Sequence, residues 1–337
     1  MNPVPYAIAA CLLLGSVHAA ETVTLGNDAW PPFIIDGPVQ GTSEKLVCEA
    51  LSRSGYTCDV RVDDWGTVLD QAREGAIDGI AAVWRNPERE GFLLFSEPYL
   101  TNRIVPLVRR DSVFRPQSLA ELAGRRVAMV PGYAYGDAVR DATSTFEVVA
   151  VKGAGEAISE VIEGRADVAL VDELVARAHE ENQPDSKADV VNAVLAYREL
   201  YFAVSRRHPQ AEQIIADFQR SYELMLKDGA VNEALGVDWL ATDLGNDGKL
   251  DLVLRSGISF DDLDNPSEQG SAYALEQSQY RMMSQSDIDY SNVNYQVDGK
   301  SHSSLQNALV EVFGKDVVCT HQEYTSTLDC SKLFQKR

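Results

Sequence analysis

The chain has 337 residues, of which 45% are hydrophobic and 24% are charged, and 51 acidic against 30 basic residues give a net charge of −21. This composition excludes a wholly disordered chain, a collagen-like fibre and a multi-span membrane protein, and the length predicts two or three domains. Nucleic acid and anionic membranes repel a chain with this much negative charge. Neither is therefore expected as a partner.

Residues 1–19 have the pattern of a secretory signal peptide. An apolar run extends from Ala7 to Gly15, and Val17-His18-Ala19 fits a cleavage site, so the mature chain is expected to begin near Ala20. The apolar run is too short for a membrane anchor, which needs about 20 residues. A lipoprotein box at Cys11 is disfavoured because this cysteine precedes the most apolar stretch. We therefore predict an exported, periplasmic protein that is not integral to the membrane.

Removal of the leader leaves four cysteines, Cys48, Cys58, Cys319 and Cys330. Their even number, the export signal and the two short spacings predict structural disulfides Cys48–Cys58 and Cys319–Cys330. Neither pair has the CxxC spacing of a redox or zinc site.

From residue 21 to about 240, strand-like and helix-like segments alternate, which predicts parallel sheets covered by helices and therefore an α/β fold. The predicted strands are Val23–Gly26, Cys58–Val62, Asp78–Val83, Arg126–Val130, Phe146–Val151, Asp167–Val171 and Tyr201–Ser205. The predicted helices are Thr42–Arg53, Trp65–Glu74, Tyr135–Ala142, Glu156–Glu163, Leu174–Glu181 and Pro209–Lys227.

The character of the sequence changes after residue 240. Residues 241–299 hold eleven acids and three bases, a net charge of −8, and lack helical periodicity, which predicts an acidic, irregular and poorly packed segment. Residues 300–337 hold four acids and five bases, and they are expected to form a helix over Ser303–Phe313 and a small disulfide-stapled unit.

Two tryptophans follow predicted strands. Trp30 lies in the run Trp30-Pro31-Pro32-Phe33, where the prolines hold the loop extended and present the indole as a rigid surface. Trp65 follows two aspartates at the end of another strand. Two aromatic side chains at equivalent strand ends can sandwich a small ligand in an α/β crevice, although Trp30 alone is equally well explained as a hydrophobic plug.

Charged residues and exposed backbone donors follow three further strands. Arg89 can present a fork of donors to a carboxylate, or it can face solvent and pair with Glu88 or Glu90. The turn over residues 130–136 leads into a helix whose first N–H groups suit an anion. Asp172 ends a strand and can either hold an ammonium group or cap the next helix.

The ordered motifs WPPF, DDW, DGIAAVWRNPER, FSEPY, PGYAYG and DVALVDE resemble the family-3 extracellular solute-binding proteins, whose well-known members bind amino acids for ABC importers. The resemblance covers roughly residues 21–240. It implies a two-lobed α/β fold of the type 2 periplasmic-binding-protein kind, with a hinge between the lobes and a small irregular C-terminal extension. Lobe 1 would comprise 20–105 and 200–240, and lobe 2 would comprise 106–199, with chain crossings near 103–108 and 196–202.

The resemblance also implies a ligand site. Trp30 and Trp65 correspond to the aromatic residues that sandwich the ligand, Arg89 to the arginine that grips its α-carboxylate, and Asp172 to the carboxylate that binds its α-amino group. The loop that also contacts the carboxylate corresponds to Gly132, Tyr133, Ala134 and Tyr135.

The sequence departs from the family pattern at two positions where many amino-acid binders carry hydroxyls. One position lies in the run around Ala82, where only the backbone could bond the ligand. The other position is Ala134. Trp84 and Tyr133 add aromatic surface and favour a bulkier or less polar solute.

The segment after the α/β region contains a candidate calcium loop. Asp243, Asp247 and Asp251 stand at positions 1, 5 and 9 with a glycine at position 6, which resembles the calcium loops of EF-hand-like and FG-GAP-type repeats. Position 3 is Gly245 and position 12 is Leu254, so a solvated acidic turn is the alternative.

We therefore predict a monomeric, non-enzymatic receptor that captures a small zwitterionic solute by lobe closure, with an ABC permease as partner and no cofactor apart from the candidate calcium. One alternative is an enzyme on the same fold, resembling the cyclohexadienyl dehydratases, which would need a general acid such as Asp172, Glu173 or Asp64. Another is a sensor or scaffold whose partner recognises the segment after residue 240. No Ser-His-Asp set, HExxH motif, P-loop or Rossmann glycine series occurs in the sequence.

Overall fold

The structure is a computed structural model and describes residues 20–255, 257, 272–275, 293–314, 318–320 and 327–329. The predicted signal peptide and Cys330 lie outside the described residues, so the leader and the Cys319–Cys330 bridge stay predictions.

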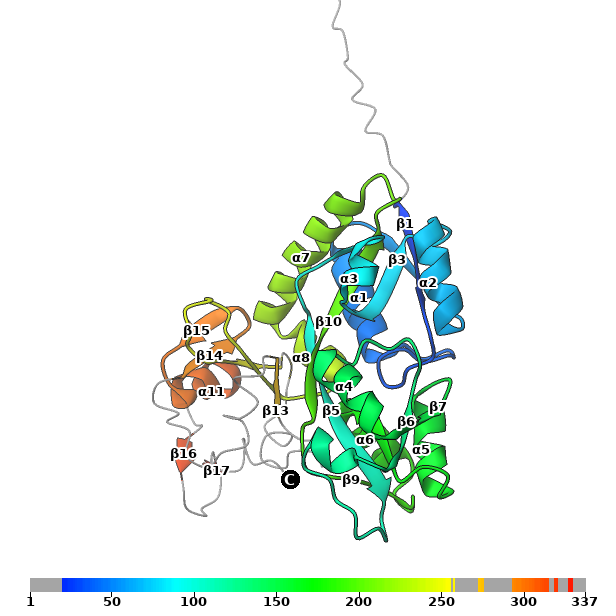
Figure 1. The fold of residues 1–337 in the computed structure, drawn as a ribbon. Helices are drawn as coiled ribbons and strands as arrows, with labels where there is room; N and C mark the ends of the chain where they lie inside the picture. Colours follow the sequence, from blue (N-terminus) through cyan, green and yellow to red (C-terminus); the bar gives the residue numbers. More distant parts are fainter. Residues whose placement is uncertain are drawn as a thin grey trace, which may run out of the picture.

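The α/β region contains ten strands that belong to one mixed sheet (Figure 1). These are β1 (Thr22–Asn27), β2 (Thr57–Val62), β3 (Gly79–Trp84), β4 (Leu93–Phe95), β5 (Leu100–Arg109), β6 (Arg126–Met129), β7 (Glu147–Ala150), β8 (Val168–Asp172), β9 (Ala188–Val190) and β10 (Ala196–Ser205). The order is β2-β1-β3-β10-β5-β8-β6-β7, with β4 also paired to β10 and β9 to β5. All six residues of β3 are buried. Its nearly continuous apolar sequence is typical of a strand that is covered on both faces of the sheet.

The helices of this region are α1 (Thr42–Arg53), α2 (Trp65–Glu74), α3 (Pro87–Glu90), α4 (Asp137–Ala142), α5 (Ala154–Ile162), α6 (Glu173–Asn182), α7 (Ala211–Asp228) and α8 (Ala230–Leu235). All lie close to where the sequence predicts a helix except the short helices α3 and α8, which were not predicted. The helix predicted from Tyr135 begins two residues later, because Gly136 has φ +101°, a left-handed conformation that cannot continue a helix. The predicted disulfide Cys48–Cys58 is confirmed and joins α1 to β2.

The two longest strands join the two halves of the sheet. Ala196–Leu200 of β10 pairs antiparallel with Leu100–Ile104 of β5. From Leu200 onward β10 pairs with β3, whereas from Ile104 onward β5 pairs with β8. We call the half built on β1–β4 the first lobe and the half built on β6–β9 the second lobe. The two-lobed α/β fold is confirmed, while its exact boundaries stay predictions.

The prediction of an irregular, poorly packed segment over 241–299 is wrong for its described part. A second sheet has the order β13-β11-β12-β14-β15 and includes residues just outside that range. Its elements are β11 (Trp239–Thr242), β12 (Asp251–Leu254), β13 (Ala272–Ala274), β14 (Asn294–Val297) and β15 (Lys300–His302), with α11 (Leu305–Phe313) beside them. Trp239, Leu252, Tyr295 and Leu309 are buried in its core. Strands of three or four residues between Asp-, Asn- and Ser-rich runs carry no helical periodicity, which explains the error.

Beyond this second sheet, β16 (Val318–Thr320) and β17 (Thr327–Asp329) form a parallel pair. No helix among the described residues is long and apolar enough to cross a membrane.

Candidate functional site

Arg89 is buried between the lobes at the end of the short helix α3. Asn86 caps this helix, and its side-chain oxygen accepts a hydrogen bond from the Arg89 backbone N–H at 2.8 Å. The guanidinium donates to the carbonyl oxygen of Trp84 and, at 2.8 Å, to that of Gly132 in the second lobe. It also lies 4.9 Å from the centre of the Trp65 ring. Arg89 is thereby fixed in the cleft by contacts from both lobes.

The guanidinium of Arg89 remains a cation although it is only 3% exposed. Burial lowers the pKa of Arg89 to about 10, which leaves it charged at neutral pH. Within the described residues its hydrogen-bond acceptors are neutral carbonyl oxygens, and no carboxylate forms an ion pair with it. The alternative of a solvent-facing pair is wrong, because Glu88 pairs with Arg73 and Glu90 with Arg85.

Tyr133 occupies the space between three tryptophans of the first lobe. Its ring centre lies 5.8 Å from that of Trp30, 6.1 Å from Trp65 and 5.5 Å from Trp84, each time edge-on. Its hydroxyl donates a hydrogen bond to Asp28 at 2.6 Å. Asp28 follows β1 and Tyr133 follows β6, so this hydrogen bond and these ring contacts bridge the two lobes.

Two buried carboxyl groups adjoin the aromatic cluster. Burial raises the pKa of Asp28, while the hydrogen bond from Tyr133 opposes that effect. Burial also raises the pKa of Asp172 to about 7. The oxygens of Asp172 accept hydrogen bonds from the backbone N–H groups of Leu174 at 2.8 Å and Arg103 at 3.2 Å, so this residue does cap α6.

The structure gathers the candidate ligand-binding residues around two adjoining cavities. The first is lined by Asp28, Trp30, Trp65, Ala82, Val83, Trp84, Arg89, Tyr133 and Ala134. The second is lined by Trp30, Trp84, Val130, Tyr133, Tyr135, Ala154, Ala157, Leu170, Val171 and Asp172. Gly132 joins them through its carbonyl contact with Arg89. Each cavity has a volume of about 10 Å³, close to the space of one water molecule. Around Arg89 and Asp172 the space between the lobes is therefore filled by the protein's own side chains, whereas a larger cavity of about 590 Å³ lies on the other side of Gly132–Tyr135.

Sequence reasoning missed two polar residues of this site. Asp28 stands two positions before Trp30 at the end of β1, and a carboxylate next to the aromatic motif was the available signal. Asn27 is fully buried, and its side chain bonds both the N–H and the C=O of Ala82 at 2.9 Å. The Ala82 backbone N–H was the donor expected to replace the missing hydroxyl. It already donates to the side chain of Asn27.

The three aspartates of the candidate calcium loop bind the protein's own polar groups. Asp243 accepts hydrogen bonds from the N–H groups of Asp247 and Gly248, and Asp247 accepts one from Lys249. Asp251 is bonded by the N–H of Leu244 and by the side chain of Gln296. Among the described residues, no group of three or more His, Cys, Asp or Glu side chains is placed to hold a metal ion. Asp247 is exposed on the turn before β12, whereas Asp251 is buried at the start of that strand, and the calcium site stays a prediction.

A two-lobed α/β fold with a buried arginine and aromatic side chains in its cleft defines the class of hinged binding proteins. The family model of the bacterial extracellular solute-binding proteins, family 3, matches residues 23–240. The chain belongs to this family.

Curated relatives include the virulence sensor protein BvgS of Bordetella pertussis, which is 27% identical over 185 residues, 54% of this chain and 15% of BvgS. The chain thus matches only a small part of that longer relative. The L-cystine-binding protein TcyJ of Escherichia coli K12 is 23% identical over 237 residues, 69% of this chain and 87% of TcyJ.

Solved structures share the fold. An ancestral arginine-binding protein bound to arginine has a TM-score of 0.58 and 22% identity, and the match covers 65% of this chain and 98% of that one. The ancestral amino-acid-binding protein AncCDT-1, a precursor of cyclohexadienyl dehydratase, has a TM-score of 0.54 and 22% identity, with 64% and 93% covered.

Proposed function

We propose that this protein is a receptor that captures a small zwitterionic solute, an amino acid or a close analogue, between its two lobes. The observation that carries this proposal is Arg89, a buried cation whose acceptors among the described residues are uncharged carbonyl oxygens. A buried charge without a counter-ion is costly, and a ligand carboxylate would supply that counter-ion through paired hydrogen bonds.

The other end of a zwitterion would lie toward Asp172. This carboxyl group lines the cavity that adjoins the Arg89 cavity, and an ammonium group beside it would favour its ionised form. Trp30 and Trp65 would cover the ligand between the two charged ends. The indole N–H of Trp65 is buried without a hydrogen-bond partner in the described structure, so it is a further donor for the solute.

Binding beside both Arg89 and Asp172 requires the lobes to part, since the two small cavities at these residues have no room for an amino acid. Tyr133 and Gly132 would leave the first lobe together, which breaks the contacts to Asp28 and Arg89. Tyr133 would then lie against the solute instead of against the tryptophans. The amount of aromatic surface favours a solute with a bulky or weakly polar side chain.

Delivery of the solute to an ABC permease is the role that we propose for the captured complex, with the protein acting as a periplasmic monomer. The L-cystine-binding relative supports a transport role. The BvgS relative favours a sensory role on the same fold, in which closure would be read by a signalling partner.

Calorimetric titration of the full chain with a panel of amino acids tests the carboxylate contact. Each ligand is paired with its decarboxylated analogue. We expect binding only when the carboxylate is present. Arg89→Ala should lower the affinity for the amino acid by at least about 100-fold, because it removes one partner of a buried charge-assisted pair. Arg61→Ala, which removes a 63% exposed arginine of β2, is the matched control. Unchanged affinity in Arg89→Ala would refute the proposal.

A dehydratase of the same fold is the second candidate, because Asp172 is a buried acid with a pKa raised to about 7 and could donate a proton at neutral pH. The other nominated acids fit less well. Glu173 is paired with Arg103 and Arg177, and Asp64 caps α2. Conversion of prephenate or arogenate by the purified protein would overturn the non-enzymatic assignment.

A further inference from the structure

Arg103 is a buried arginine of the hinge strand β5 that connects the candidate site with the second sheet. It is only 2% exposed and lies in the part of β5 that pairs with β10. Its guanidinium donates a hydrogen bond to the carbonyl oxygen of Ala274 in β13 at 2.6 Å and lies 4.9 Å from the centre of the Tyr273 ring. Two successive residues of the second sheet therefore hold this side chain in place.

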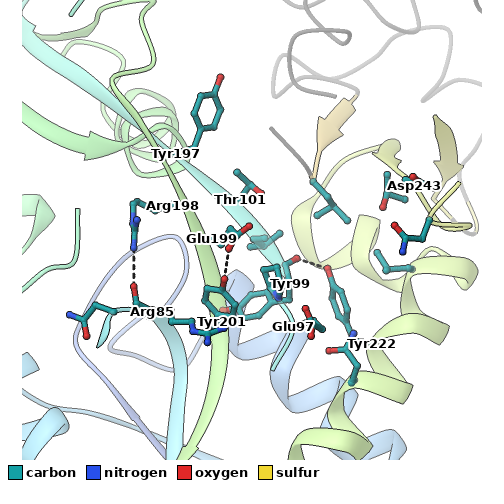
Figure 2. Close-up of a pocket in the computed structure, with 18 of the residues that line it drawn as sticks. Arg85, Glu97, Tyr99, Thr101, Tyr197, Arg198, Glu199, Tyr201, Tyr222 and Asp243 are labelled. Carbon is teal, nitrogen blue, oxygen red and sulfur yellow. Dashed lines mark hydrogen bonds between the residues drawn. The ribbon is translucent and has the colours of Figure 1, made fainter. Parts of the chain in front are cut away.

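The second sheet contacts the hinge at a further point close to Arg103. The Tyr273 hydroxyl donates a hydrogen bond to the carbonyl oxygen of Thr101 at 2.9 Å. Thr101 also lines a pocket of about 740 Å³ together with Asp243, the residue that follows β11 (Figure 2). The second sheet thus borders the part of β5 through which the chain passes from one lobe to the other.

Arg103 also contacts the end of the candidate site at Asp172. Its backbone N–H donates to a carboxylate oxygen of Asp172 at 3.2 Å, and its guanidinium lies 3.7 Å from the carboxylate of Glu173. Burial raises the pKa of Asp172 most, Glu173 raises it further, and the guanidinium of Arg103 lowers it. Arg103 is therefore a cation that favours the ionised form of this carboxyl group.

The guanidinium lies behind Asp172 as seen from the cleft. Asp172 lines the second of the two small cavities, and Arg103 is not among the described residues that line it. A solute in that cavity meets the carboxylate of Asp172 before it meets Arg103. Arg103 therefore acts on a solute through Asp172.

We propose that Arg103 is a positioning residue of the solute site and that the second sheet holds it there, so that the segment after residue 240 controls how tightly the cleft binds the ammonium group of a solute. This inference rests on the proposed function, because it takes Asp172 as the group that binds the ammonium. An arginine side chain stays charged even when it is buried. Held beside Asp172, this charge keeps the carboxylate in the form that attracts an ammonium.

The coupling between the cleft and the second sheet works in both directions. Detachment of β13 from the hinge frees the Arg103 guanidinium from the Ala274 carbonyl and the Tyr273 ring, and Asp172 then loses part of the charge that stabilises its ionised form. Conversely, a solute ammonium that ionises Asp172 holds Arg103 more firmly, and with it β13. Two binding equilibria that share one group must affect each other by the same factor. Solute capture thus tightens the attachment of the second sheet to the hinge.

Nuclear magnetic resonance titration of the full chain tests this inference without any solute. The quantity measured is the midpoint pH at which the carboxyl ¹³C resonance of Asp172 titrates. Arg103→Gln should raise this midpoint by roughly half a pH unit or more, and Arg103→Lys, which keeps a cation, should restore at least half of the change. Tyr273→Leu, which removes the ring against Arg103, should raise it by about 0.2 pH unit or more. Arg109→Gln is the matched control, because it changes a 47% exposed arginine of the same strand and should leave the midpoint unchanged.

Calorimetric titration with L-arginine at pH 6 then measures the effect on solute binding. At this pH, below the midpoint of Asp172, the affinity follows the ionised fraction of its carboxyl group. We expect the affinity to fall about threefold or more in Arg103→Gln and to stay within about twofold in Arg109→Gln.

Three outcomes overturn the proposal. An unchanged midpoint in Arg103→Gln, or an equal change in Arg103→Lys, would mean that the charge of Arg103 does not act on Asp172. An unchanged midpoint in Tyr273→Leu would mean that the second sheet does not hold Arg103, and this variant decides the question even if Arg103→Gln does not fold. The midpoint needs no solute, so this inference and amino-acid capture, which Arg89→Ala tests, can fail separately.

Discussion

Asp172 has a structural role and is also the residue that we propose to bind the ammonium group of the solute. Its oxygens cap α6 and bond the backbone of β5, yet burial raises its pKa to about 7 from an ordinary value of 3.8. An acid with a raised folded-state pKa holds its proton more tightly in the folded protein. The contribution of Asp172 to the stability of the folded state therefore falls as pH rises from about 4 to about 7 and is constant above that range.

We expect Asp172→Asn to remove this pH dependence, since asparagine still caps a helix but does not ionise. The free energy of unfolding of the variant, relative to the native protein, should rise by about 2–3 kcal/mol between pH 5 and pH 8. Urea titrations at four pH values measure the difference. Parallel stability curves for the two proteins would show that Asp172 keeps an ordinary pKa.

At the scale of single residues, the sequence identifies which side chains gather but not how they fill the space. Trp30, Trp65 and Arg89 stand at strand ends in a recognisable order. The Tyr133 ring lies between tryptophans of the opposite lobe. This position depends on how far the lobes close. Contacts between lobes depend on rigid-body geometry, which no local pattern records.

At the scale of elements, the Cys48–Cys58 disulfide ties helix α1 to the edge strand β2. It closes a loop across a sequence separation of 10 residues. In the chain-entropy account, a loop of that length stabilises the folded state by about 2–3 kcal/mol. We expect Cys48→Ala/Cys58→Ala to lower the free energy of unfolding by that amount.

Urea unfolding with and without dithiothreitol measures the effect of this disulfide. The reductant should destabilise the native protein and leave the double variant unchanged. If both proteins unfold at the same urea concentration without reductant, α1 and β2 are held together by packing alone.

The long helices of the α/β region could be predicted, whereas the short helices α3 and α8 and the short strands β4 and β9 could not. The limits of α1 and α2 agree with the sequence because an amphipathic run of ten or more residues carries a clear period of 3.6. The sheet formed by β11–β15 was missed because each strand has only three or four residues. In β14, Tyr295 and Val297 are buried and alternate with partly exposed neighbours, but two such positions are too few to stand out in a polar sequence.

The contact between Tyr273 of β13 and the hinge strand β5 gives a prediction about how the second sheet is attached. The Tyr273 hydroxyl is buried and donates to the Thr101 carbonyl oxygen, and its ring lies 4.9 Å from the Arg103 guanidinium. Tyr273→Phe keeps the ring but removes the hydrogen bond. We expect a loss of about 1 kcal/mol in stability and faster amide exchange around Thr101. Unchanged exchange there would mean that the sheet does not support the hinge.

At the scale of the whole molecule, side chains of the two lobes contact each other across the cleft. Among the described residues, the contacts across the cleft include Arg89 to the Gly132 carbonyl, Tyr133 to Asp28, the Tyr133 ring to three tryptophans, and the Tyr135 ring to Trp84. Tyr133 contributes both a hydrogen bond and ring contacts to this set. The closed form therefore depends on a side chain that occupies the place proposed for the solute.

We expect Tyr133→Ala to open the ligand-free protein, because it removes the ring contacts and the hydrogen bond to Asp28 in one change. Small-angle X-ray scattering should show a larger radius of gyration, and addition of the solute should reverse the increase by supplying new contacts between the lobes. Tyr56→Ala is the matched control, since Tyr56 bonds Asp217 within the first lobe and does not line the cleft. If Tyr133→Ala scatters like the native protein, closure is set by the hinge strands and not by the side chains in the cleft.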